Sequence, residues 1–242
     1  LGSRGALLTE PYADDSGNYG HLTLDTNDFK AISKAAAELG FQLNTHAIGD
    51  SANHEVLDVY EARYQDHPDK DHRWRIEHAQ HLLPSDVSRF AAIGVIASMQ
   101  SIHCISDAVY VPIRLGEERA ENGAYLWRSL LDSGAVVMEG TDVPVERIDP
   151  FANMYAATTW KSKADGTPFY PQQCKTMEEE LKAYTVWNAY GAFEEDHKGT
   201  LTPGKLADIT VLDRNILEVS PEELLHTEVV YTIIGGEVKY QR

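Results

Sequence analysis

The chain of 242 residues has little of several features that mark common protein classes. It has only two cysteines, Cys104 and Cys174, which lie far apart and outside any paired motif. We expect both to be reduced thiols in a cytoplasmic protein, and a disulfide between them is the less favoured alternative. No apolar stretch approaches the roughly 18 residues that a membrane-spanning helix needs. The first residues also lack the charged and apolar segments of a signal peptide, so we expect a protein that works in the cytoplasm without a membrane.

Basic residues are scarce as well. The chain has 21 lysines and arginines against 38 aspartates and glutamates, which gives a formal net charge of -17. A surface of this charge repels nucleic acids and anionic membranes. The remaining composition, 43% apolar and 24% charged, is typical of a globular protein. We therefore expect a small-molecule substrate as the partner and leave open the formation of a homo-oligomer.

Helical and strand patterns alternate along the first 140 residues. Four segments with apolar residues at helical spacing are predicted helices: 28–40, 50–65, 85–93 and 124–133. Four short apolar runs are predicted strands: 41–46, 73–78, 95–99 and 135–140. Such alternation is typical of an α/β fold with a parallel sheet. The long polar segment 102–122, between the third strand and the next helix, is a predicted lid over a substrate pocket.

The pattern changes from residue 200 onward. Residues 206–212 form a predicted strand, and residues 228–240 form a predicted hairpin with a turn at Gly235 and Gly236. Three β-segments in so short a stretch cannot close a sheet, and they need partner strands that the sequence does not contain. Residues 1–199 and 200–242 are therefore predicted to be two structural units.

Three of the apolar runs stop at a residue that can bind a metal. His46 and His78 are 32 residues apart, and His78 and Asp142 are 64 residues apart. A strand with its crossover helix takes roughly 30 residues or more, so the three side chains fall one and two repeats apart. In a barrel of alternating strands and helices, they would meet at the C-terminal ends of the strands, where active sites lie. Two imidazoles and a carboxylate are a usual ligand set for zinc and related metals.

Each of these residues also has an ordinary interpretation. A lone His46 would be a capping or hydrogen-bonded loop histidine, and Asp142 would be a turn residue before a proline. His81 competes with His78, although His78 directly ends its apolar run. The shared position at strand ends favours a metal site. There Asp142 would bind the metal and also accept the proton of a metal-activated water, as the catalytic base.

Five short motifs in order carry a resemblance to a known family. They are Leu-Gly-Ser-Arg-Gly-Ala (1–6), His-Ala-Ile-Gly-Asp (46–50), Ile-Glu-His-Ala-Gln (76–80), Gly-Thr-Asp-Val-Pro (140–144) and the stretch Gly-Thr-Leu-Thr-Pro-Gly-Lys-Leu-Ala-Asp-Ile-Thr-Val-Leu-Asp (199–213). In this order and spacing they resemble the amidohydrolase superfamily, and more narrowly its amidohydrolase 3 branch of metal-dependent hydrolases. The resemblance covers nearly the whole chain. It implies the C-terminal half of a (β/α)8 TIM-like barrel, over 1–199, followed over 200–242 by strands of a small, composite β-sandwich.

The resemblance also implies roles for single residues. His46, His78 and Asp142 would be the metal ligands of strands five, six and eight, with zinc as the expected divalent metal. The segment after Met99 resembles the strand-seven loop of the branch, in which Gln100, His103 and Asp107 would approach the substrate. For His103, an ordinary loop histidine is an equal alternative. The implied reaction is hydrolysis of a carbon–nitrogen bond in a small amide-type molecule by metal-activated water.

The chain departs from the family pattern in one respect. The family takes a His-x-His pair from strand one and often a carboxylate or carbamylated lysine from strand four, and none of the ten histidines forms such a pair. We therefore expect the C-terminal half of a longer enzyme, inactive alone, whose partner is the N-terminal half of the same protein. Two alternatives remain: an inactive fragment or packing domain that lacks the N-terminal ligands, and a metal-assisted isomerase on the same barrel.

Overall fold

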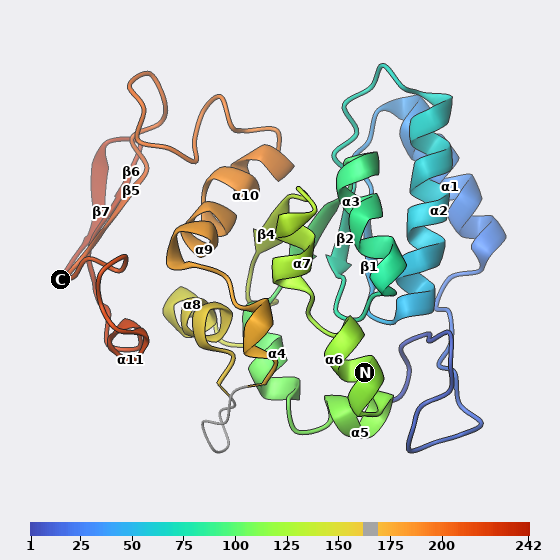
Figure 1. The fold of residues 1–242 in the computed structure, drawn as a ribbon. Coiled ribbons are helices and arrows are strands. Elements are labelled where there is room, and N and C mark those ends of the chain that lie inside the picture. Colours follow the sequence, from blue (N-terminus) through green and yellow to red (C-terminus); the bar gives the residue numbers. More distant parts are fainter. Residues whose placement is uncertain (162–168) are drawn as a thin grey trace.

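The computed structural model describes residues 1–161 and 169–242 and contains two sheets (Figure 1). The larger sheet has four strands: β1 (Asn44–Ala47), β2 (Arg75–His78), β3 (Ile96–Met99) and β4 (Val137–Glu139). They lie in the order β1-β2-β3-β4, and every neighbouring pair is parallel. The predicted mixed α/β fold with a parallel sheet is thereby confirmed. Because the strands are parallel and in sequential order, their C-terminal ends lie along one edge of the sheet.

The helices between these strands begin and end at residues that the sequence marks. Helix α1 (Thr26–Leu39) is capped by the Asp25 side chain, which accepts a hydrogen bond from the Asn27 amide. It stops at Gly40, and α3 (Val87–Ile93) stops at Gly94, both with positive φ that glycine adopts at little cost. Helix α2 (Asp50–Asp66) runs between β1 and β2, and the 3-10 turn η1 (Pro84–Asp86) precedes α3. These three predicted helices are confirmed within a few residues of their expected ends.

The fourth predicted helix, 124–133, is shorter than expected. Helix α7 spans Trp127–Asp132 only. Ala124 instead forms an isolated antiparallel bridge with His81, and Tyr125 has a φ of 52°. These contacts come from a segment far away in the sequence, so local helix propensity does not show them.

The segment 102–122 is helical rather than a polar loop, and its role as a lid over a substrate pocket stays a prediction. The segment folds into α4 (Ser101–Asp107), α5 (Val111–Leu115) and α6 (Glu117–Gly123). Residues 101–105 are all buried in α4. The physical reason is that Ile102, Cys104 and Ile105 of α4 pack into the main hydrophobic core. The polar residues beside them in the helix are buried as a consequence.

Between β4 and the smaller sheet, the described residues form four further helical segments. They are α8 (Pro150–Thr159), the 3-10 turn η2 (Pro171–Gln173), α9 (Met177–Tyr184) and α10 (Val186–Gly191). Helix α9 begins with a capping box between Thr176 and Glu179, and both α9 and α10 pack against β4. The main core contains the fully buried Trp74, Trp127 and Trp160. Aromatic side chains of this size bury about 150–250 Å² each, so they supply much of the hydrophobic stabilisation.

The smaller sheet lies at one end of the molecule (Figure 1) and is antiparallel, in the order β5-β6-β7. Its strands are β5 (Ile209–Leu212), β6 (Val229–Ile234) and β7 (Glu237–Gln241). Gly235 and Gly236 both have positive φ, as a two-residue hairpin turn requires, and the predicted hairpin is confirmed. Short helix α11 (Pro221–Leu224) packs against α8. None of the helices in the described part of the chain has the length and apolar character needed to cross a membrane.

Candidate metal centre

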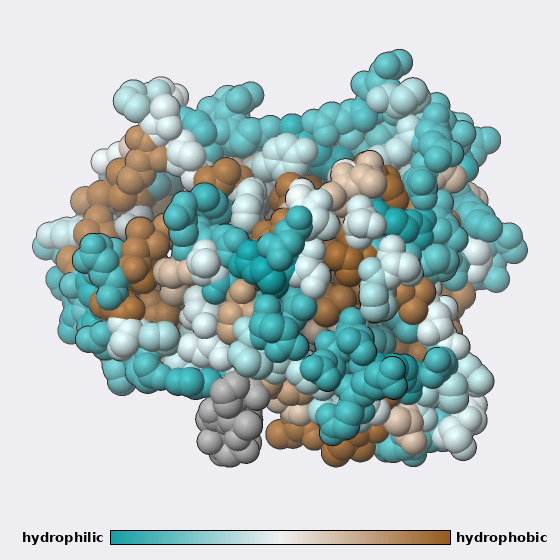
Figure 2. Space-filling view, in the orientation of Figure 1, coloured by the Kyte–Doolittle hydropathy of each residue, from teal (hydrophilic) through white to brown (hydrophobic). Residues whose placement is uncertain are grey.

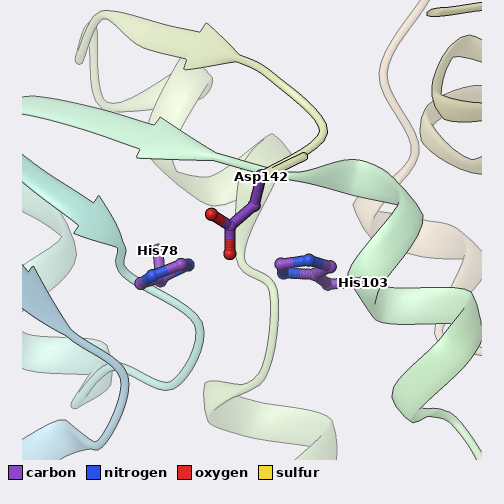
Figure 3. A group of neighbouring side chains, drawn as sticks. All are labelled: His78, His103 and Asp142. Carbon is purple, nitrogen blue, oxygen red and sulfur yellow. The ribbon is translucent and has the colours of Figure 1, made fainter. Parts of the chain in front are cut away.

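Two imidazoles and a carboxylate meet at the C-terminal edge of the parallel sheet. His78 is the last residue of β2, His103 lies in α4 directly after β3, and Asp142 follows β4. One ligand atom from each lies within 4.8 Å of the others. Figure 3 shows the Asp142 carboxylate directed between the two rings, whose centroids are 6.0 Å apart and whose planes differ by 23°. This is a donor set that could hold a metal ion.

The backbone is unusual at two of these three residues. His78 has a φ of 79° and Asp142 a φ of 54°, and neither is a glycine. The left-handed region is costly for residues with a Cβ, and such residues cluster at functional sites. The chain therefore turns sharply as it leaves β2 and again after β4, and both turns direct a side chain into the group.

The orientation of His78 is fixed by Gln100, which follows β3. His78 Nδ1 donates to Gln100 Oε1 at 2.7 Å, while Gln100 Nε2 donates to the Ser98 carbonyl at 3.2 Å. With the proton on Nδ1, the lone pair is on Nε2, which is the arrangement of a metal-binding imidazole. Burial lowers the pKa of His78 below its usual value, so the neutral ring is favoured.

His103 is buried within the same group. Its Nδ1 lies 3.4 Å from Gln80 Nε2, a long contact, and Gln80 also donates to the Tyr125 hydroxyl at 3.0 Å. Its Nε2 is buried and has no hydrogen-bond partner among the residues that the structure describes. Buried polar atoms without a partner are uncommon in proteins, and a metal ion bound there would satisfy this one.

His46 lies beside the group. Its ring centroid is 4.4 Å from that of His78, and the two ring planes are at 74° to each other. His46 is an exposed residue of β1. Burial, and next the neighbouring His78, lower the pKa of His46. The structure thus brings together His78 and Asp142 of the predicted ligand set, adds His103, and places His46 next to them. The ligand role of His46 and the substrate role of His103 stay predictions.

The other predicted substrate residues have partners within the protein. Gln100 is buried against His78, as described above. Asp107, the last residue of α4, accepts hydrogen bonds from the hydroxyls of Tyr110 and Tyr125. Their roles toward a substrate stay predictions. His81 lies elsewhere: its Nε2 is 3.7 Å from Asp50, and both side chains are almost fully buried.

Sequence reasoning missed the residues that support this group from behind. Glu139, inside the apolar run of β4, contacts the first turn of α4, and it pairs with the buried Lys175. A charged residue in an otherwise apolar strand is the signal that could have found Glu139. Lys175 has no such local signal, because it lies between η2 and α9, outside any apolar run, and its partner Glu139 is far away in the sequence.

Comparisons with known proteins identify the family. The family model described as the amidohydrolase family matches residues 1–240. The chain is 37% identical to protein LONG AFTER FAR-RED 3 of Arabidopsis thaliana, covering 99% of this chain and 41% of that protein. It is 29% identical to an N-substituted formamide deformylase of Arthrobacter pascens, over 87% of this chain and 39% of that protein.

Solved structures agree with this assignment. The crystal structure of an uncharacterized metal-dependent hydrolase from Pyrococcus horikoshii OT3 matches with a TM-score of 0.81 and 31% identity, over 91% of this chain and 44% of that one. The chain thus spans less than half the length of these relatives. The match over residues 1–240 confirms the resemblance of the five motifs: the chain belongs to the amidohydrolase family.

Proposed function

We propose that this chain forms part of a metal-dependent hydrolase that cleaves carbon–nitrogen bonds in small amide-type molecules. The observation that carries the proposal is the group of His78, His103 and Asp142 at the C-terminal ends of three strands. The relative named as an N-substituted formamide deformylase supports the type of bond, and the solved metal-dependent hydrolase supports the use of a metal.

The residues of the group fit a divalent metal. Two imidazoles and a carboxylate suit zinc and also iron or manganese, and zinc is the metal that we propose. His78, His103 and Asp142 would hold it, with His46 as the adjacent candidate ligand. Bound there, such an ion lowers the pKa of water from about 15.7 toward 7 and polarises a carbonyl group.

The side chains around the proposed metal have different roles. Gln100 keeps the His78 ring in one orientation, and burial keeps that ring neutral. The exposed Asp142 carboxylate, between the two rings, can accept the proton of the attacking water and pass it to the leaving nitrogen. Gln100 and Asp107 are the proposed contacts to the substrate, whereas His103, which the resemblance expected at the substrate, is proposed here as a metal ligand.

We also propose that the chain is the C-terminal half of a (β/α)8 barrel over 1–199, with sandwich strands over 200–242. Strands β1 and β4 are the edges of the described sheet, and open edges favour pairing with further strands. Figure 2 shows apolar residues exposed over the small C-terminal sheet; those of this sheet that are exposed include Val211, Ile234 and Val238. The N-terminal half of the same protein is the proposed partner for both surfaces, and the chain alone is expected to be inactive.

The compartment proposed is the cytoplasm, and the free thiols of Cys104 and Cys174 are compatible with it. A second copy of the whole protein is the alternative partner, and sedimentation would detect their association.

The test is hydrolysis by the whole protein reconstituted with zinc. N-substituted formamides, linear amides and cyclic amides are offered in water labelled with ¹⁸O, and the product is analysed by mass spectrometry. We expect one label per cleaved bond. Turnover without label would indicate an isomerase, and absence of turnover and of bound metal in the whole protein would leave only a packing role.

A further inference from the structure

Three charged side chains are buried together behind β4. Lys175 forms ion pairs with Glu139 and, at 2.6 Å, with Glu180, and all three side chains are 0% exposed. The Trp127 ring covers the lysine, with its centroid 5.0 Å from Nζ. Removing ionisable groups from water is costly, and burial raises the pKa of the Glu180 carboxyl above its usual value; such clusters are seldom a net source of stability. A role other than stabilising the fold would therefore explain why these three side chains are buried together.

One of the two carboxylates contacts the helix that carries His103. Glu139 Oε2 accepts a hydrogen bond from the Ser101 amide at 3.1 Å, and its Oε1 accepts one from the Ser101 hydroxyl at 2.6 Å. Asn153 accepts from the next amide, that of Ile102, at 2.6 Å, and donates to Glu139 Oε2 at 2.7 Å. The first amides of a helix have no partner within the helix, so these contacts fix the start of α4.

The same residue is tied to the strand that leads to Asp142. Glu139 is the last residue of β4, and its carbonyl accepts a hydrogen bond from Asn188 Nδ2 at 3.0 Å. The following amide, that of Gly140, donates to the Met99 carbonyl at 3.2 Å. Glu139 thus joins two elements: α4, with His103 two residues after Ser101, and β4, with Asp142 three residues beyond its end.

We propose that Glu139 is a positioning residue, which Lys175 holds in place and which sets His103 relative to Asp142. This inference rests on the proposed function, because it concerns the same metal centre. Glu139 is not a member of the group that could hold the metal, and it acts through its contacts to α4. Groups that support metal ligands from behind typically change metal affinity about 10–100-fold when they are replaced.

Glu180 provides a matched control. The Glu180 side chain is equally buried and pairs with the same lysine. Among the described residues, Asn153 Nδ2 also lies 3.5 Å from its carboxylate. Glu180→Gln and Glu139→Gln each leave Lys175 with one carboxylate and one amide. They differ in that only Glu139→Gln removes the carboxylate that faces α4.

The experiment compares the whole protein, including its N-terminal half, with these two variants by two readouts. Hydrogen exchange of the α4 amides is measured without metal, and Co²⁺ is titrated while its visible absorption spectrum is recorded. We expect faster exchange in α4, an altered Co²⁺ spectrum and about 10–100-fold weaker Co²⁺ binding for Glu139→Gln. Glu180→Gln should match the wild type in all three.

Ser101→Ala keeps all three ionisable side chains in place and guards against a Glu139 variant that does not fold. It removes one hydrogen bond to Glu139, so we expect the same changes at smaller size. The proposal is overturned if α4 exchange is unchanged in these variants, or if Glu180→Gln changes it as much as Glu139→Gln does. Failure of the wild type to bind Co²⁺, with the expected exchange pattern, would instead overturn the metal centre and leave the placement of His103 by Glu139 intact.

Discussion

Replacing Gln100 by leucine should release the imidazole of His78 while keeping the volume of the side chain nearly constant. In the structure, His78 Nδ1 donates to Gln100 Oε1 at 2.7 Å, and Gln100 is buried. Leucine offers no acceptor, so the ring loses the bond that sets its tautomer and its angle. Supporting hydrogen bonds of this kind typically contribute about 10–100-fold to metal affinity. At about 1.4 kcal/mol for each factor of ten, this is a loss of about 1.4–2.8 kcal/mol in binding free energy.

The assay is competitive titration of Zn²⁺ against a chromophoric chelator, with circular dichroism to show that the variant is folded. Gln100→Glu is the control, because it keeps an acceptor at the same place and should bind Zn²⁺ at least as tightly as the wild type. Equal affinity of wild type and Gln100→Leu would refute the reasoning, since it would mean that His78 either does not bind the metal or needs no support.

Three further predictions follow from the structure. In the whole enzyme, Asp142→Asn should keep much of the metal but reduce the rate about 10² to 10⁴-fold, and single-turnover kinetics would show whether the chemical step is the one lost. His103→Ala should remove more metal than His46→Ala, as metal analysis can show, because His103 rather than His46 belongs to the group within 4.8 Å. Arg128 lowers the pKa of Glu179 to about 2, so this pair stabilises the fold fully above the unfolded pKa of about 4.3 and is lost as pH falls toward 2. Glu179→Gln should lower stability at pH 7 by about 1 kcal/mol and weaken its dependence on pH between about 4 and 2 in urea titrations.

Much of the sheet could be predicted because its signals are local. The apolar runs that end at His78 and before Asp142 are short and bounded by turns, and Gly40 and Gly94 mark helix ends. The strands are therefore near their expected places, and His78 and Asp142 lie together as expected for ends of parallel strands.

The errors come from contacts between distant segments. The bridge between Ala124 and His81 makes α7 shorter than the predicted helix, and no local sequence pattern predicts this bridge. The start of α4 is held by hydrogen bonds to Glu139, and Glu139 pairs with Lys175, 36 residues further along the chain. His103 could be singled out as a residue near the site, but its place beside Asp142 results from these non-local contacts.

The central claim is that His78, His103 and Asp142 bind one divalent metal. It is tested most directly by anomalous diffraction from crystals of the whole protein grown with Zn²⁺, recorded at the zinc absorption edge. We expect a single strong peak within bonding distance of an imidazole nitrogen of His78, one of His103 and a carboxylate oxygen of Asp142. A peak at another place, or none at these three side chains in well-ordered crystals, would contradict the claim.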